Sequence, residues 1–225
     1  MAEVKIDKII RTRRRTVALV VMPDASIVIR APHGVSLDYI QNFVNQKSGW
    51  IEKKQKFIAE IVRKRDPKKF TDGEKFYLAG EKLSLKIQPG AKPKVWSEGG
   101  SLNITEACIA NPLKYLSTWY RVQAKNIIPG RVQMFAVKLG FKFKSIQING
   151  AKSRWGSCGH KNSLNFSWRL VMAPIEIIDY VIVHELVHTE IKNHSPKFYS
   201  RLEEVMPDYN SREKWFKQNI GFAEL

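Results

Sequence analysis

The N-terminal residues alternate between apolar and polar side chains, as β-strands do when one face is buried. This pattern covers residues 4–10 and 16–22, and a polar turn at residues 23–26 leads into a third apolar run at residues 27–30. We therefore expect a small sheet at the N-terminus.

A helical pattern follows this sheet. Apolar residues recur at helical spacing over residues 37–65, Ser36 is a suitable N-cap, and Asp66 followed by Pro67 ends the helix. The Ser48-Gly49 pair has weak helix propensity, so an irregularity is expected in the middle of this segment.

Further strands and one long helix are predicted in the middle of the chain. Apolar runs separated by glycine-containing turns indicate two hairpins. Their strands are residues 76–78 with 82–87, and residues 94–96 with 101–104. A helix over residues 111–139 follows, with a break expected at Pro129-Gly130. Strands at residues 145–148 and 163–168 and three C-terminal helices complete a mixed α+β fold.

The residues His-Glu-Leu-Val-His at positions 184–188 carry the clearest chemical signal in the chain. Residues four apart lie on one face of a helix, so His184 and His188 can offer two imidazole nitrogens to a single ion. Two neutral imidazoles and a third protein ligand around Zn²⁺ leave a fourth position for water, whose pKa the metal lowers. Glu185 lies beside them and is the candidate general base.

The alternative for this motif is a structural histidine pair without a metal. Residues 174–191 are apolar on nearly every side, which indicates a buried central helix. Burying two His and one Glu side chain there without partners would cost several kcal/mol. A metal ion supplies that partner, and three of the five histidines lie between positions 184 and 194, so we favour a metal site.

His194 is the candidate third ligand. A Ser-Pro pair directly after it is typical of a helix start, so His194 is held in a short corner between two helices. Glu203 and Glu204 on the next helix are alternative ligands, because zinc also accepts carboxylates. Candidates for hydrogen bonding to a ligand histidine are Asp179, Glu190 and Asp208.

Several short motifs in the C-terminal half occur together in one known family. They are Arg-Trp-Gly-Ser-Cys at residues 154–158, Leu-Asn-Phe at 164–166, the segment 178–188, Asn-His-Ser at 193–195 with Phe198, and Pro-Asp-Tyr at 207–209. In these motifs and their order the chain resembles the YgjP-like predicted metal-dependent hydrolases, relatives of the WLM and SprT-like zinc metallopeptidases. The resemblance implies a zincin-type fold, zinc at His184, His188 and His194, and Glu185 as the catalytic acid and base.

The predicted elements divide into two parts. We expect an N-terminal β-rich lobe with one long helix over residues 1–108. A zincin-like metallohydrolase domain with a central metal-binding helix is expected over residues 109–225. The fold class is therefore α+β, with a β-rich lobe and a zincin-like catalytic half.

The charge balance is strongly basic. The chain has 38 Lys and Arg against 21 Asp and Glu, a formal net charge of +17, which favours anionic partners such as nucleotides or nucleic acid. Arg13, Arg14 and Arg15 form a basic cluster and are candidates for binding an anion or nucleic acid. A run of like charge is also typical of a solvated face, and no known nucleic-acid-reading motif accompanies this one.

The remaining composition indicates a cytoplasmic protein. Two cysteines are too few for a disulfide scaffold, and the basic N-terminus lacks the apolar segment of a secretory signal. No apolar run is long enough to cross a membrane, so no membrane partner is expected. Cys158 is interpreted as a packed turn residue rather than a reactive thiol or a metal ligand.

A strand beside the metal helix can position a peptide. The run around Leu164, Asn165 and Phe166 is interpreted as such an edge strand, whose free backbone would pair with an extended substrate. Arg154 and Asn165 are candidates for stabilising a developing oxyanion. Stacking on Trp155 is the alternative role of Arg154.

The sequence as a whole predicts a zinc-dependent hydrolase of the metallopeptidase type that acts on a peptide or protein. One zinc ion is expected, although manganese, cobalt or nickel can occupy similar sites. Two other enzymatic hypotheses stay open: hydrolysis of nucleoside triphosphates, because the same chemistry attacks phosphoryl groups, and a protease associated with nucleic acid. A binding module with a structural metal is the non-enzymatic alternative.

Overall fold

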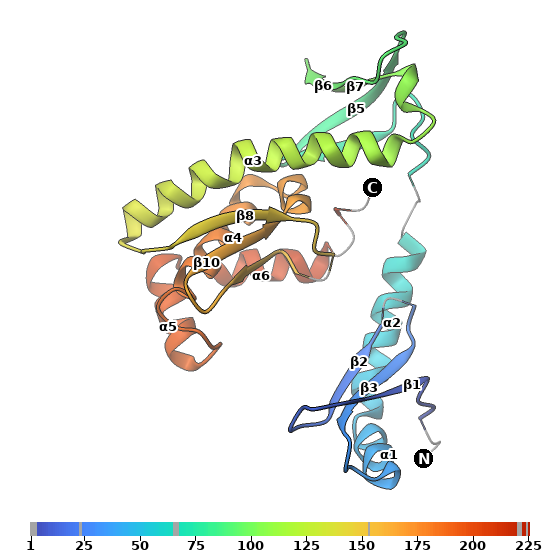
Figure 1. Cartoon of the computed structure of the whole chain (residues 1–225), viewed down its shortest axis with the longest axis vertical. Helices are drawn as coiled ribbons and strands as arrows, with labels where there is room; N and C mark the ends of the chain where they lie inside the picture. Colours follow the sequence, from blue (N-terminus) through green and yellow to red (C-terminus); the bar gives the residue numbers. More distant parts are fainter. Residues whose placement is uncertain (1–3, 23, 65–67, 153, 220–221, 224) are drawn as a thin grey trace. The chain divides into compact units, whose positions relative to one another are not determined.

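The structure is a computed structural model of the chain. It describes residues 4–22, 24–64, 68–152, 154–219, 222–223 and 225, with residues 60–64 and 217 described by their backbone alone. The contacts divide the chain into two compact units, Met1–Asp66 and Pro67–Leu225. Helices and three small sheets within the described residues confirm the predicted α+β class (Figure 1). The helix end predicted at Asp66 and Pro67 lies outside the described residues.

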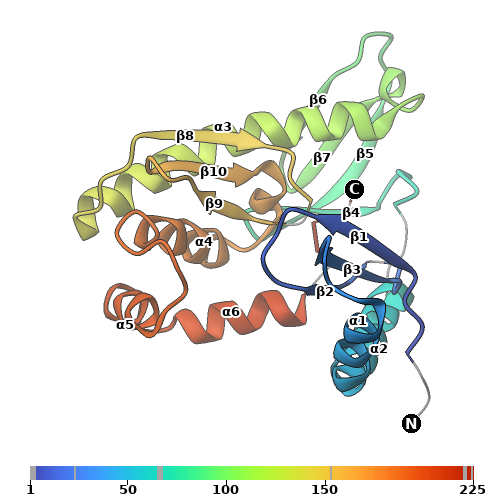
Figure 2. The same cartoon turned by 60° about the horizontal axis from the view of Figure 1, so that its bottom comes forward.

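The first unit is a small sheet packed against two helices (Figures 1 and 2). Its elements are β1 (Lys8–Thr12), β2 (Ala18–Val21), β3 (Ile27–Pro32), α1 (Leu37–Gln46) and α2 (Ser48–Lys64). The strand order is β1-β3-β2, with β3 parallel to β1 and antiparallel to β2. Ile29, Ile40 and Val44 are fully buried and form the centre of this core.

The single helix predicted after this sheet is two helices. Ser36 caps α1 as predicted, and its hydroxyl accepts a hydrogen bond from the backbone N–H of Tyr39 at 3.2 Å. Lys47 ends α1 and lies directly before Ser48 and Gly49, the first residues of α2. The expected irregularity is therefore a break between helices, at residues that hold a helix only weakly.

The second unit contains two sheets and the remaining helices. Its strands are β4 (Lys75–Leu78), β5 (Glu81–Gln88), β6 (Val95–Glu98), β7 (Ser101–Thr105), β8 (Ser145–Asn149), β9 (Gly156–Cys158) and β10 (Ser163–Ser167). Its helices are α3 (Pro112–Leu139), α4 (Ile175–Val187), α5 (Pro196–Val205) and α6 (Tyr209–Gln218), with the 3₁₀ helices η1 (Glu106–Cys108) and η2 (Trp168–Met172). The strand orders are β4-β5-β7-β6 and β8-β10-β9, and both predicted hairpins are confirmed.

The four-stranded sheet shares its core with the C-terminal helices. Phe76, Leu85 and Ile104 belong to the same buried cluster as Trp119 and Leu170. The predicted division between residues 108 and 109 therefore falls inside the second compact unit, and it stays a prediction about the organisation of the chain.

Helix α3 runs without a break through Pro129. The predicted break at this position is wrong: α3 extends from Pro112 to Leu139 with Pro129 in its interior. Proline removes one backbone hydrogen bond from the helix. Ile128 and Val132 on either side of it are fully buried, and tertiary packing of this kind supplies most of the stability of a helix in a folded protein.

Strand β9 lies at an edge of its sheet and was not predicted. β10 pairs with β8 on one side and with β9 on the other, so the interpretation of β10 as a strand with a free edge is wrong. The Gly-Ser-Cys segment of β9 is short and has no alternation of apolar residues, which is why it gives no strand signal. Cys158 accordingly ends a strand instead of lying in a turn.

An ion pair joins the two long helices of the second unit. Arg131 on α3 donates two hydrogen bonds to the carboxylate of Asp179 on α4, through Nε and Nη2. Asp179 is buried, whereas the Arg131 side chain remains 29% exposed. A forked arginine–carboxylate contact of this kind fixes the angle between its two elements more tightly than a single hydrogen bond does.

Replacing Asp179→Ala should destabilise the protein by about 2 kcal/mol, because it leaves the Arg131 guanidinium half-buried without its partner. Urea unfolding of the purified chain measures this free energy. Lys56→Ala is the control, since the Lys56–Glu52 pair lies on the surface and should be worth less than about 1 kcal/mol. Equal effects of the two substitutions would contradict the structural role of the Arg131–Asp179 pair.

Candidate metal centre

Helix α4 carries the His-Glu-Leu-Val-His motif at its C-terminal end. It contacts α3, α5, α6 and β9 (Figure 2). Nearly all of its residues from Ile177 onward are buried, as the apolar sequence predicts. The helix ends at Val187, and His188 is its C-cap residue. A polar motif is therefore placed inside the core of the second unit.

Three histidine side chains converge at the end of this helix. His194 lies in the connection between α4 and α5, directly before the N-cap residue Ser195 of α5. Its Nε2 atom is 3.0 Å from Nε2 of His184 and 3.2 Å from Nε2 of His188. The corner predicted from the sequence thus folds His194 back over α4, and the three residues could hold a metal ion.

The surroundings of these rings favour neutral imidazoles. Nδ1 of His188 lies 2.9 Å from the carbonyl oxygen of Ile191, and donation to this oxygen leaves the Nε2 lone pair free. Burial, together with the neighbouring His188 and His194, lowers the pKa of His184 to about 3. The ring of Phe198 lies within 4.9 Å of all three imidazoles, measured between ring centroids, and shields one side of the cluster from water.

Glu185 is buried beside the histidines and against strand β9. A β-carbon at Gly156 would lie 2.6 Å from Cγ of Glu185, so only glycine leaves room for this carboxylate. Burial raises the pKa of Glu185 to about 8, although the backbone N–H of Cys158 and the charge of Arg154 act in the opposite direction. Its Oε2 atom has no hydrogen-bond partner among the described residues. The environment thus favours the protonated form of the Glu185 carboxyl group, and Oε2 is available to a ligand that can exchange a proton with it.

The outer edge of β9 faces this carboxylate. The carbonyl of Trp155 and the N–H of Gly159 bond to β10, so the backbone groups of Gly156 and Cys158 point away from β10. No strand in the described part of the chain pairs with this outer edge. Because the amide of Cys158 also approaches Glu185, the free strand edge and the carboxylate belong to one site.

The two oxyanion candidates lie on different sides of the sheet. Arg154 directly precedes the aromatic residue next to β9, is exposed, and is close enough to lower the pKa of Glu185. Asn165 pairs with Ser157, whereas Phe166 pairs with Gly156, so the Asn165 side chain lies on the face opposite Glu185. The structure therefore brings Arg154 to the site and does not bring Asn165 there.

The other acidic candidates have partners away from the histidines. Glu190 and Glu204 both pair with Arg201, Asp208 pairs with Arg212, and Asp179 pairs with Arg131. Glu203 is exposed on α5. None of these carboxylates belongs to the group of described residues that could hold a metal at the three histidines.

The three arginines of the basic cluster lie in the first unit, between β1 and β2. Arg13 and Arg15 are exposed, and Arg14 is half-buried and donates to Oγ1 of Thr16 at 3.4 Å. The histidines belong to the second unit. Binding of an anion or nucleic acid by these arginines stays a prediction.

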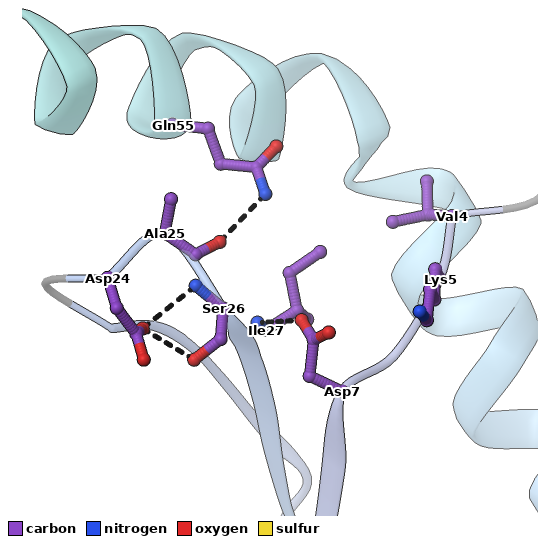
Figure 3. Close-up of a pocket in the computed structure, with 8 residues that line it drawn as sticks. All are labelled: Val4, Lys5, Asp7, Asp24, Ala25, Ser26, Ile27 and Gln55. Carbon is purple, nitrogen blue, oxygen red and sulfur yellow. Dashed lines mark hydrogen bonds between the residues drawn. The ribbon is translucent and has the colours of Figure 1, made fainter.

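A shallow hollow of about 440 Å³ also lies in the first unit (Figure 3). Its polar groups are used by the fold itself. Asp7 accepts a hydrogen bond from the N–H of Ile27, Asp24 accepts two from Ser26, and Gln55 donates to a backbone carbonyl of the same turn. The hollow is therefore separate from the chemistry of the histidines.

Sequence reasoning missed two residues that shape the site. Gly156 lies in the Arg-Trp-Gly-Ser-Cys motif at residues 154–158. Its role depends on the approach of Glu185 from another element, which no local pattern reveals. Tyr180 lies one turn before His184 on the same face of α4, and its ring packs edge-on against the His184 ring at 5.8 Å. The four-residue spacing from Tyr180 through His184 to His188 was the available signal.

The sequence profile of the YgjP-like family, metallopeptidase domain, matches residues 15–219. The chain belongs to the YgjP-like family. This membership makes it a metal-dependent hydrolase of the metallopeptidase type, for which a peptide or protein is the expected substrate class. The family implies a divalent metal, and the three clustered histidines are suited to hold one.

Two solved structures are similar to part of this chain. The metallopeptidase zymogen abylysin of Pyrococcus abyssi is 19% identical, with a TM-score of 0.38, over 42% of this chain and 95% of that protein. The zymogen jannalysin of Methanocaldococcus jannaschii is 26% identical, with a TM-score of 0.37, over 40% and 94% respectively. No curated protein matches the chain. No helix among the described residues is both long and apolar enough to cross a membrane.

Single substitutions of His184, His188 or His194 to alanine should each abolish binding of one divalent ion per chain. We expect losses in affinity above the 10–100-fold range that is typical when only a hydrogen-bond partner of a ligand is removed. Elemental analysis after dialysis, combined with competition against a chromophoric chelator, measures both stoichiometry and affinity. His160→Ala is the matched control because His160 is an exposed histidine outside the cluster. Full binding by a His194 variant would remove that residue from the metal site.

Glu185→Gln should stabilise the metal-free protein at pH 8. The folded-state pKa of Glu185 is about 8 against an ordinary value of 4.5, so the wild type loses stability as the pH rises through this interval. One pKa unit corresponds to about 1.4 kcal/mol, and a gain of more than about 2 kcal/mol is expected at pH 8, shrinking towards pH 4.5. Urea unfolding with a chelator measures it. Glu203→Gln, at an exposed glutamate, should change nothing at either pH.

Proposed function

We propose that the protein is a zinc-dependent peptidase in which Glu185 acts as general base and acid. The observation that carries this proposal is the convergence of three imidazole Nε2 atoms beside a buried carboxylate. General acid–base chemistry needs a group that is held within reach of the reacting atoms and whose pKa lies near the working pH. Glu185 is buried beside the three histidines, and burial raises its pKa towards neutral pH.

The donor set fits a zinc ion. Two nitrogens that each bind zinc at about 2.1 Å with tetrahedral angles are about 3.4 Å apart. The Nε2 atom of His194 lies 3.0 and 3.2 Å from those of His184 and His188, close to this separation. Three protein ligands are typical of catalytic zinc, whereas structural zinc is closed by four. When bound, such an ion lowers the pKa of water and polarises a carbonyl group.

Glu185 moves the proton in this scheme. Its carboxylate takes a proton from water as the nucleophile forms and returns it to the nitrogen of the leaving amine. Gly156 allows the side chain to lie flat against β9, and the backbone N–H of Cys158 orients it. Arg154 is close enough to this carboxylate to stabilise negative charge that develops nearby.

The outer edge of β9 supports an extended peptide as substrate. The outward N–H and C=O of Gly156 and the outward C=O of Cys158 are directed as in a strand that pairs with a neighbour, whereas the N–H of Cys158 bonds to Glu185. A peptide added there would receive main-chain hydrogen bonds. Fixing the peptide beside Glu185 in this way would place its scissile carbonyl before any reaction begins. We therefore propose that β9, and not β10, is the strand that pairs with the substrate backbone.

Cleavage of a casein digest by the zinc-loaded protein tests the proposal. Glu185→Gln should lower the rate by at least about 100-fold while one zinc ion stays bound, because only the proton transfer is removed. Gly156→Ala should have a similar effect, since its β-carbon displaces Glu185. Glu203→Gln is the control and should keep full activity.

The same samples are assayed against a panel of nucleoside triphosphates. Release of phosphate or pyrophosphate that depends on Glu185, with no cleavage of peptides, would replace the peptidase proposal by nucleotide hydrolysis. Peptide cleavage that survives in Glu185→Gln would contradict the role of this residue.

A further inference from the structure

Two arginines flank one buried indole in the second unit, apart from the histidine cluster. Trp168 begins η2 and is almost fully buried. The guanidinium carbon of Arg169 lies 4.2 Å from the centroid of its ring, and that of Arg121 on α3 lies 5.6 Å from it. Two positive charges therefore share one aromatic side chain.

Neither guanidinium has an acidic partner in the part of the chain that the structure describes. Among the described residues, no carboxylate lies within 4 Å of Arg121 or Arg169. By contrast, Arg131, Arg201 and Arg212 in the same unit each pair with a carboxylate. Arg169 donates one hydrogen bond to the carbonyl of Gly150 at 3.1 Å. Burial and the charge of Arg121 lower the pKa of Arg169. Like charges held together in this way are stabilised by an anion.

The indole N–H of Trp168 lies close to Arg121 and Gly150. Nε1 of Trp168 is buried and has no hydrogen-bond partner among the described residues. A β-carbon at Gly150 would lie 2.9 Å from Nη2 of Arg121 and 3.6 Å from Nε1 of Trp168. Gly150 therefore leaves the space that Nη2 of Arg121 occupies, beside the buried indole N–H of Trp168.

The backbone around this space is held by its own hydrogen bonds. Asn149 accepts from the N–H of Ala151 at 3.0 Å, and Ser167 donates to the carbonyl of Ala151 at 2.7 Å. Gly150 is thereby fixed at the end of β8, beside α3, which contacts both β8 and η2 (Figure 1). The carbonyl of Gly150 that accepts from Arg169 is therefore in place before any ligand arrives, which lowers the entropic cost of binding.

We propose that Arg121, Arg169 and the indole N–H of Trp168 form a binding site for a phosphate group. Two guanidiniums match the charge of a phosphate dianion, and their forked N–H donors match its oxygens. The indole N–H supplies a third donor that bonds to the ligand. The site is independent of the proposed peptidase activity, because it uses none of the residues of the metal centre. It also accounts for part of the basic charge surplus of the chain.

Titration of the full-length protein with inorganic phosphate at constant ionic strength tests this proposal. The indole N–H signal of Trp168 is followed by NMR in protein carrying ¹⁵N-tryptophan and is assigned with Trp168→Phe. We expect this signal to shift in a saturable manner. Phosphate bound at the histidine cluster would leave it in place, so the two sites are distinguished by the readout.

Three variants and one control determine which groups bind. Arg121→Gln and Arg169→Gln should each weaken binding at least tenfold, and Gly150→Ala should do so without any change in charge, by displacing Arg121. Lys125→Gln is the control: it removes one exposed charge one turn further along α3 and should leave the affinity within twofold. An equal loss in Lys125→Gln would show diffuse attraction to positive charge and overturn the proposal.

Adenosine 5′-monophosphate is titrated in parallel to identify the source of the phosphate. A tighter response to the ester than to inorganic phosphate assigns the site to organic phosphates, and the reverse assigns it to the free anion. Absence of a shift at Trp168 with both ligands up to millimolar concentration would refute the site.

Discussion

The removal of two imidazoles and a carboxylate from water is the constraint on which the second unit depends. Polar groups inside a core need partners, and the chain supplies them both from neighbouring residues and from distant elements. The carbonyl oxygen of Ile191 is the hydrogen-bond partner of Nδ1 of His188, and the backbone N–H of Cys158 donates to Glu185. Arg131 neutralises Asp179 on the same helix. Helix α4 is thus held by polar contacts as well as by its apolar faces, and these contacts orient the motif.

The local parts of the site could be read from the sequence. The spacing of His184, Glu185 and His188 depends only on helix periodicity, and the Ser-Pro helix start after His194 depends only on capping chemistry. The approach of Glu185 to Gly156 could not be read, because it joins residues from two elements whose relative placement no local pattern encodes. The failure of Asn165 has the same origin, since the register between β9 and β10 decides which face its side chain occupies.

The fold follows the same division between local and distant information. The mixed α+β class, both hairpins and the cap at Ser36 follow from patterns a few residues long. Continuity of α3 through Pro129 depends on the burial of Ile128 and Val132, which outweighs the intrinsic effect of proline. The four-stranded sheet resembles a separate lobe in the sequence, yet its inner face packs into the core that holds α3 and η2. Such assignments require tertiary contacts.

The shortness of β9 has a mechanical consequence. This strand is three residues long, pairs with β10 alone within the described residues, and packs against α4. Its two outward-facing residues are also the ones that touch Glu185. A shift of β9 therefore moves the groups that pack against the Glu185 carboxylate, so the position of this short strand sets the position of the carboxylate.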